Sequence, residues 1–175
     1  MTVPYQVVIT DLIDDDLAPE REVLDGLAQV TALHARSEAE LVGRIEQADA
    51  VILYHELALT AATIRRLERC RLIVRGGVGF DNVDRPLARE LGIPVTNVPD
   101  YGTEEVADTA LAMLLALTRG VHLANSVLRA GQGDWSYERA VPLGRLRGRV
   151  LGIVGLGRIG TAMAVRGKAL GMDVA

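Results

Sequence analysis

Five short runs of β-branched and aliphatic residues alternate with helix-like segments in the first hundred residues of this chain. Each run is almost continuously apolar, which is typical of strands buried on both faces of a parallel sheet. Parallel neighbours need long crossover connections, and helices usually supply them. The alternation therefore predicts an α/β domain built on a parallel sheet. Its strands are expected at residues 6–10, 30–34, 50–54, 72–75 and 95–98.

Helix signals fill the four intervals between these strands. Ser37 and Glu40 have the spacing of a capping box, in which each side chain can satisfy the other's exposed amide. Pro86 stands where a first helical turn tolerates a missing N–H, and Gly92 marks a helix end. Helices are expected after Pro19, from Ser37, over residues 60–69 and from about Asp84 to Gly92.

The sequence changes character after Pro99. Thr103 is expected to cap a helix whose first turn holds Glu104 and Glu105, acids that suit the positive end of the helix dipole. The apolar residues that follow recur at helical spacing in a wide stripe, so we expect this helix to be buried on most of its surface. Gly120 is expected to break or bend it.

A glycine-rich segment, Gly155-Leu156-Gly157-Arg158-Ile159-Gly160, follows an expected strand at residues 150–154 and precedes a helical pattern. In this context the spacing favours a dinucleotide fingerprint over an ordinary strand-to-helix turn. Gly155 permits the turn, Gly157 lets the backbone approach a pyrophosphate, and Gly160 allows close packing. The amides of Arg158 and Ile159 would face the phosphates. The acid that binds the ribose is not identified, because Asp173 comes too early.

A second glycine-rich turn, from Arg75 through Gly77, Val78 and Gly79, follows the fourth strand. Ligands of open parallel sheets bind at such strand ends, and consecutive amides there can hold a carboxylate. From the residues alone, this interpretation and that of a flexible turn are equally supported. His55, just past a strand end, is the histidine expected to face a cleft.

Other site chemistries are not supported. The aspartates at positions 11, 14, 15 and 16 lack the pattern of a calcium loop and predict a solvated, helix-capping loop. The three histidines have no partners at zinc-ligand spacing, so no metal is expected. The net charge is −4 with scattered basic residues, which argues against nucleic-acid binding. The apolar stretches are too short to cross a bilayer. A single cysteine and no leader-like start fit a cytoplasmic protein.

Taken in order, the motifs resemble the D-isomer-specific 2-hydroxyacid dehydrogenases, most closely the branch that includes the C-terminal binding proteins. The stretches that carry the resemblance span nearly the whole chain: Leu53–His55, Ile73–Asp84, Gly92–Pro99, Glu104–Asp108 and Leu146–Gly160. It implies a flavodoxin-like substrate domain over residues 1–99 and the first part of a Rossmann NAD-binding domain, truncated, over residues 100–175, with a hinge near residues 99–103.

The same resemblance implies hydride transfer between NAD and a small D-2-hydroxy or 2-keto acid, with NADP not excluded, in a cytoplasmic homodimer. It assigns the substrate carboxylate to Gly77, Val78 and Gly79, with Arg75 nearby, and places Val78 close to the nicotinamide. His55, from its place after a strand, is expected to bind the substrate as well. Val106 matches a cofactor-contacting position but cannot donate the hydrogen bond of the threonine found there in some members. The catalytic arginine, acid and histidine are expected beyond residue 175, so this chain by itself is expected to be inactive.

Two alternatives remain open at this stage. One is an NAD-sensing, corepressor-like scaffold of the C-terminal binding protein type, which a peptide groove would distinguish. The other is a short flavodoxin-like binding module that carries a vestigial fingerprint.

Overall fold

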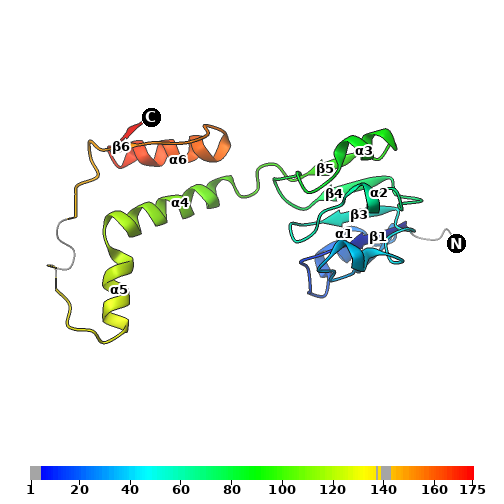
Figure 1. Ribbon diagram of the computed structural model, residues 1–175, viewed down its shortest axis with the longest axis horizontal. Helices are drawn as coiled ribbons and strands as arrows, with labels where there is room; N and C mark the ends of the chain where they lie inside the picture. The colour runs from blue at the N-terminus through cyan, green and yellow to red at the C-terminus, as the bar shows by residue number, and fades with distance from the viewer. Residues whose placement is uncertain (1–4, 137, 139–142) are drawn as a thin grey trace. The chain divides into compact units, whose positions relative to one another are not determined.

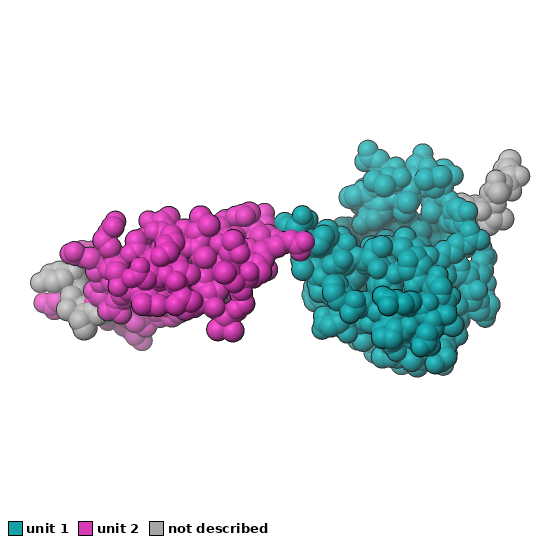
Figure 2. Space-filling model, turned by 90° about the horizontal axis from the view of Figure 1, so that it is seen from above, with its two compact units in different colours: residues 1–101 teal, residues 102–175 magenta. Residues whose placement is uncertain are grey.

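The computed structural model describes residues 5–136, 138 and 143–175. The chain divides into two compact units, residues 1–101 and 102–175, coloured teal and magenta in Figure 2. The division falls between Tyr101 and Gly102, two residues beyond the boundary expected from the sequence.

Unit 1 is a five-stranded sheet in the order β2-β1-β3-β4-β5, with every neighbouring pair parallel (Figure 1). This is the strand order of flavodoxin-like folds. The strands are β1 (Tyr5–Ile9), β2 (Ala28–Ala32), β3 (Ala50–Leu53), β4 (Leu72–Arg75) and β5 (Val95–Asn97). The α/β prediction is confirmed, and the expected bounds of β4 are those observed. β2 begins two residues earlier than expected, because Ala28 and Gln29, which carry no buried apolar side chain, also pair with β1.

The connecting segments of unit 1 are shorter than the sequence predicts. They are α1 (Ala18–Val23), the 3-10 turn η1 (Glu38–Leu41), α2 (Ala61–Ile64) and α3 (Arg85–Glu90). The expected capping box is wrong: the Ser37 hydroxyl donates to the Glu40 carboxylate at 3.2 Å rather than capping an amide. After Ile64 the backbone changes to 3-10-type hydrogen bonds, in which an amide donates to the carbonyl three residues earlier instead of four. The third helix therefore ends well before residue 69. In α3, Asp84 caps the amide of Leu87.

The larger core of unit 1 lies on the face of the sheet where side chains such as Val51, Leu53 and Ile73 are fully buried. Leu41, Ile45, Leu59 and Ile64 from the connecting segments pack against them. A smaller cluster on Val7, Ile9, Leu17 and Val30 lies on the other face, and Leu17 is the residue that precedes α1. Burial on both faces explains why these strands read as continuous apolar runs.

Unit 2 contains α4 (Thr103–Thr118), α5 (Val121–Arg129), β6 (Val150–Leu151), α6 (Arg158–Ala169) and β7 (Asp173–Val174), and the two strands pair in parallel. β6 is shorter than expected, although the Ile153 amide still donates to Ala175. Gly102, not Thr103, occupies the N-cap position, and Thr103 is already helical. Gly120 breaks the helix as expected, with a φ of 65°.

α4 is much more exposed than its apolar stripe alone predicts. Only Ala107 is buried within it, while Met113 and Leu117 are 62% and 66% exposed. Its main packing partner in unit 2 is α6, which covers one side of it. In the described parts of the chain no single helix is long and apolar enough to span a membrane; α4 and α5 satisfy the criteria only together, bent by 69°.

Candidate functional site

Arg75 ends β4 and starts the glycine-rich turn of unit 1. Its guanidinium lies in the space that a side chain at Gly77 would occupy: a Cβ atom added to Gly77 would overlap the guanidinium and lie 3.7 Å from the Tyr101 hydroxyl. Only a residue without a side chain leaves room for the arginine there. The Arg75 Nε is buried and, within the described residues, has no hydrogen-bond partner. Arg75 is therefore packed in place with a donor still to be satisfied.

The turn itself is tied down through its carbonyl groups. The Asn97 side-chain amide donates to the Val78 oxygen at 2.8 Å, and the Val98 amide donates to the Gly77 oxygen at 3.1 Å. Among the described residues, the amides of Val78 and Gly79 have no acceptor. Val78 is 40% exposed. The turn thus offers two fixed, available N–H donors next to a positive charge, an arrangement that suits a carboxylate.

His55 lies in the loop that follows β3 and is exposed. The residues on either side of it are held firmly. The Asp11 carboxylate accepts hydrogen bonds from the amides of Tyr54 and Glu56 at 2.8 and 2.9 Å. The Asn82 side chain donates to the carbonyls of Tyr54 and Leu57 at 2.9 and 2.7 Å. His55 therefore projects from a rigid segment, although its backbone lies in a loop.

Tyr54 connects this loop to the glycine-rich turn. A Cβ on Gly76 would lie 2.6 Å from a ring carbon of Tyr54, so the ring lies against that backbone. Burial, with smaller contributions from Glu20, Asp11 and Asp15, raises the pKa of Tyr54. Its hydroxyl stays protonated at neutral pH.

The sequence analysis missed the residues that support this site. Asp11 was expected in a solvated loop, but its side chain is buried and 1% exposed. Asp15 and Asp16 do accept amide hydrogen bonds at the start of α1, from Leu17 and Ala18. The signal for Asp11 was its position directly after a buried strand, where polar residues meet the loops of neighbouring strands. Tyr101, Asn82 and Asn97 gave no comparable signal.

The fingerprint of unit 2 forms a tight turn between β6 and α6. Gly155 has a φ of 97°, and Gly157 is the N-cap of α6. A Cβ on Gly160 would overlap the carbonyl oxygen of Gly155, so the first turn of the helix lies directly against the loop. A Cβ on Gly157 would meet nothing within 4 Å. The open side of the turn is therefore at Gly157, where Arg158 and Ile159 begin the helix and Ile159 is 38% exposed.

α6 is held on both sides. Gly167, which the sequence analysis did not single out, lies so close to β6 that a Cβ there would be 2.7 Å from Leu151. On the α4 side, Arg166 donates to Glu104 at 2.8 Å and to Asp108 at 2.7 Å, and these contacts raise the pKa of Arg166. Val106 is 49% exposed and, two residues from either acid, does not share their face of α4.

The described residues hold no group of three His, Cys, Asp or Glu side chains arranged to bind a metal ion. Both candidate regions instead present backbone amides and arginines, which are groups that bind anions. One region suits a carboxylate and the other a phosphate.

Comparison with known proteins gives consistent matches. The model of the D-isomer specific 2-hydroxyacid dehydrogenase catalytic domain matches residues 7–165. D-3-phosphoglycerate dehydrogenase from Methanocaldococcus jannaschii is 32% identical over 97% of this chain and 31% of that protein. The chain thus spans about a third of this curated relative.

Two solved structures of 2-hydroxy-acid-converting enzymes are also similar to this chain. D-lactate dehydrogenase from Aquifex aeolicus, in complex with NAD and lactic acid, has a TM-score of 0.84 and 27% identity, covering 96% of this chain and 50% of that one. An NADPH-dependent glyoxylate/hydroxypyruvate reductase from Sinorhizobium meliloti, in complex with NADP and malonate, has a TM-score of 0.78 and 33% identity, covering 99% and 53%. Nothing in these matches supports the corepressor-like alternative.

Proposed function

The chain belongs to the family of D-isomer-specific 2-hydroxyacid dehydrogenases, and on this basis we propose that the whole protein transfers a hydride between NAD and a small D-2-hydroxy or 2-keto acid. In this proposal residues 1–99 form the substrate domain and residues 100–175 the first part of the cofactor domain.

The observation that carries the proposal is the pairing of Arg75 with the turn that follows it. A 2-hydroxy acid carries a carboxylate beside the carbon that reacts. The two available amides of Val78 and Gly79 would bind that carboxylate, and the guanidinium of Arg75, whose Nε has no partner among the described residues, would add a charged donor group. Charge-assisted hydrogen bonds of this kind orient as well as bind. His55 would border the substrate on the neighbouring loop.

The fingerprint turn fits a dinucleotide. Open space at Gly157 leaves the backbone free to approach a pyrophosphate, and the residues that would hold it are Gly155, Gly157, Arg158, Ile159 and Gly160. Val78 and Val106 would contact the cofactor by packing alone, since neither side chain carries a donor. The bound cofactor supplies the hydride acceptor. Among the relatives, one structure holds NAD and another NADP, so we propose NAD without excluding NADP.

Oxidation of the alcohol also releases the hydroxyl proton, which a general base must take. We assign this role to no residue of this chain, because none of its three histidines matches the acid–base histidine of the family. The whole protein is proposed to act as a homodimer in the cytoplasm. The net charge of −4 with dispersed basic residues supports a small-molecule substrate rather than a nucleic acid.

Thermal stabilisation of the whole protein tests the proposal. NADH bound to the native state must raise the melting temperature, by an amount that grows with its concentration relative to Kd. Glyoxylate, hydroxypyruvate, D-lactate and 3-phosphoglycerate, taken from the names of the relatives, should then be screened for oxidation or formation of NADH. If neither NADH nor NADPH raises the melting temperature, and replacing Gly157 by valine changes nothing, the dinucleotide assignment is wrong.

A further inference from the structure

A hollow of about 430 Å³ lies between α3 and the edge strand β5 in unit 1. Its volume is within the usual range for small-molecule sites. The lining residues come from the helix, the turn after it and the first residue of the strand: Arg85, Arg89, Gly92, Ile93, Pro94 and Val95. It is separate from the glycine-rich turn, which follows β4.

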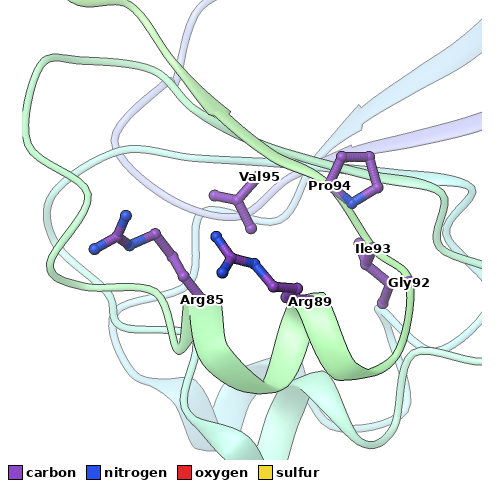
Figure 3. A pocket seen from close by; sticks show the side chains of 6 residues that line it. All are labelled: Arg85, Arg89, Gly92, Ile93, Pro94 and Val95. Atoms are coloured by element: carbon purple, nitrogen blue, oxygen red, sulfur yellow. The ribbon is translucent and has the colours of Figure 1, made fainter.

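Two arginines supply all the charge of this hollow. Arg85 and Arg89 are four residues apart on α3 and therefore share a face, and both side chains rise on the side of the helix where Val95 lies (Figure 3). Within the described residues neither guanidinium is paired with a carboxylate. Like charges at this spacing repel each other. An anion between them would remove that repulsion.

Arg85 is held in position from the side. Its guanidinium carbon lies 4.1 Å from the centre of the Phe80 ring, the geometry of a cation–π contact. This contact orients the guanidinium without using its N–H donors. Those donors remain available to a ligand.

The edge of the sheet adds a backbone donor. The Ile73 amide donates to the Pro94 carbonyl at 3.0 Å, and Val95 is the register partner of Ile73. Successive residues of a strand direct their N–H and C=O groups to alternate sides. Those of Val95 therefore point away from β4, to the open edge, where no further described strand pairs with β5.

We propose that this hollow binds a phosphoryl group, with Arg85, Arg89 and the Val95 amide as donors. Three donor groups match the three terminal oxygens of a phosphate monoester dianion, and guanidinium groups suit such oxygens. Ile93, Pro94 and Val95 provide an apolar wall beside them, which suits a phosphate ester with an organic group. The proposal does not depend on the dehydrogenase function.

An NMR titration of the protein with inorganic phosphate tests the site at constant ionic strength. We expect a saturable shift of the Val95 amide and the Arg89 Nε signals at millimolar phosphate. In the double variant Arg85→Gln/Arg89→Gln, the midpoint should rise at least tenfold. Arg21→Gln, which removes an exposed arginine from α1, should leave the titration unchanged.

The source of the phosphoryl group is distinguished by repeating the titration with phenyl phosphate. Tighter binding than inorganic phosphate identifies an ester, and equal or weaker binding identifies free phosphate. A linear, non-saturating shift of Val95 overturns the site, and so does an equal response from the double variant. Removal of the two charges relieves repulsion on α3, so we expect the variant to fold.

Discussion

The buried carboxylate of Asp11 accepts a hydrogen bond from the backbone amide of Tyr54 at 2.8 Å, across 43 residues of sequence. Its second oxygen accepts from Glu56, and the Thr10 hydroxyl donates to the first. The two strand ends β1 and β3 are thus joined by a side chain. Because His55 lies between the two bonded amides, the position of this histidine depends on Asp11.

Asp11→Asn should destabilise unit 1 and loosen the His55 loop. The asparagine keeps the shape but replaces one acceptor oxygen by a donor, which would then face another N–H. Leaving a buried donor unsatisfied costs about 1–3 kcal/mol. Chemical denaturation measures the loss, and hydrogen exchange at the Tyr54 and Glu56 amides should become faster. Asp14→Asn removes an exposed carboxylate and should change stability by less than about 0.5 kcal/mol. Equal effects of the two variants would contradict this role.

The two glycines at the helix end of the fingerprint should separate binding from folding. Valine at Gly157 enters open space, so the melting temperature should hold while NADH affinity falls at least about tenfold through steric exclusion of the pyrophosphate. Valine at Gly160 overlaps the Gly155 carbonyl and should cost about 1–3 kcal/mol of stability. Isothermal titration and thermal melts of the whole protein measure the two quantities. A loss of stability in Gly157→Val as large as in Gly160→Val would mean that the open side is misplaced.

Acid should weaken unit 1 through Asp49. The Gln6 amide, which donates at 2.8 Å, and the Arg69 guanidinium lower the pKa of this carboxyl in the folded state against a smaller opposing effect of burial. Because the pKa of Asp49 is lower in the folded than in the unfolded chain, its ionised carboxylate stabilises the fold at pH values above the unfolded pKa of about 3.9. This stabilisation is lost as the pH falls through the pKa of the folded state. Stability should therefore fall more steeply below about pH 4 in the wild type than in Asp49→Asn. If the free energy of unfolding, measured by chemical denaturation from pH 5 to 2.5, falls equally in the two proteins, this role of Asp49 is refuted.

The sequence predicted elements whose residues carry a local signal. β4 was located to the residue: the four residues expected, 72–75, are those that pair with β3. The Ser37–Glu40 spacing also fits the 3-10 turn that forms, so local spacing could not tell the two apart. The apolar periodicity of α4 predicted the helix, but not its burial, because burial depends on which other segments pack against it. Met113 and Leu117 are exposed.

The candidate site divides in the same way. Arg75 and the glycines that follow it were recognisable, because a glycine-rich turn after a buried strand is a local pattern. Asp11 and Asn82 support the His55 loop through hydrogen bonds to residues 25 or more positions away in the sequence. The strand order β2-β1-β3-β4-β5 places β1 beside β3, and this brings Asp11, which follows β1, to the loop after β3. Their roles follow from the topology, not from any motif.

Arg75→Lys tests the substrate site more sharply than removal of the charge. Lysine keeps the positive charge but lacks the planar guanidinium, whose Nε is the buried, unsatisfied donor in this structure. Because that Nε donates to no described residue, folding loses no hydrogen bond and the melting temperature should stay nearly constant. Substrate binding should lose a charge-assisted hydrogen bond, worth about 1.5–3 kcal/mol, so kcat/KM should fall roughly 10- to 150-fold.

The matched control for this variant is Arg71→Lys, the same substitution just before β4. The Arg71 guanidinium carbon lies 5.8 Å from the centre of the Tyr5 ring, an exposed contact at the opposite end of β4 from the turn. Steady-state kinetics of the whole protein with its best 2-keto acid should show no change in kcat/KM for this variant. If Arg75→Lys instead lowers the melting temperature and leaves kcat/KM intact, Arg75 serves the fold, and the carboxylate must bind through the amides of Val78 and Gly79 alone.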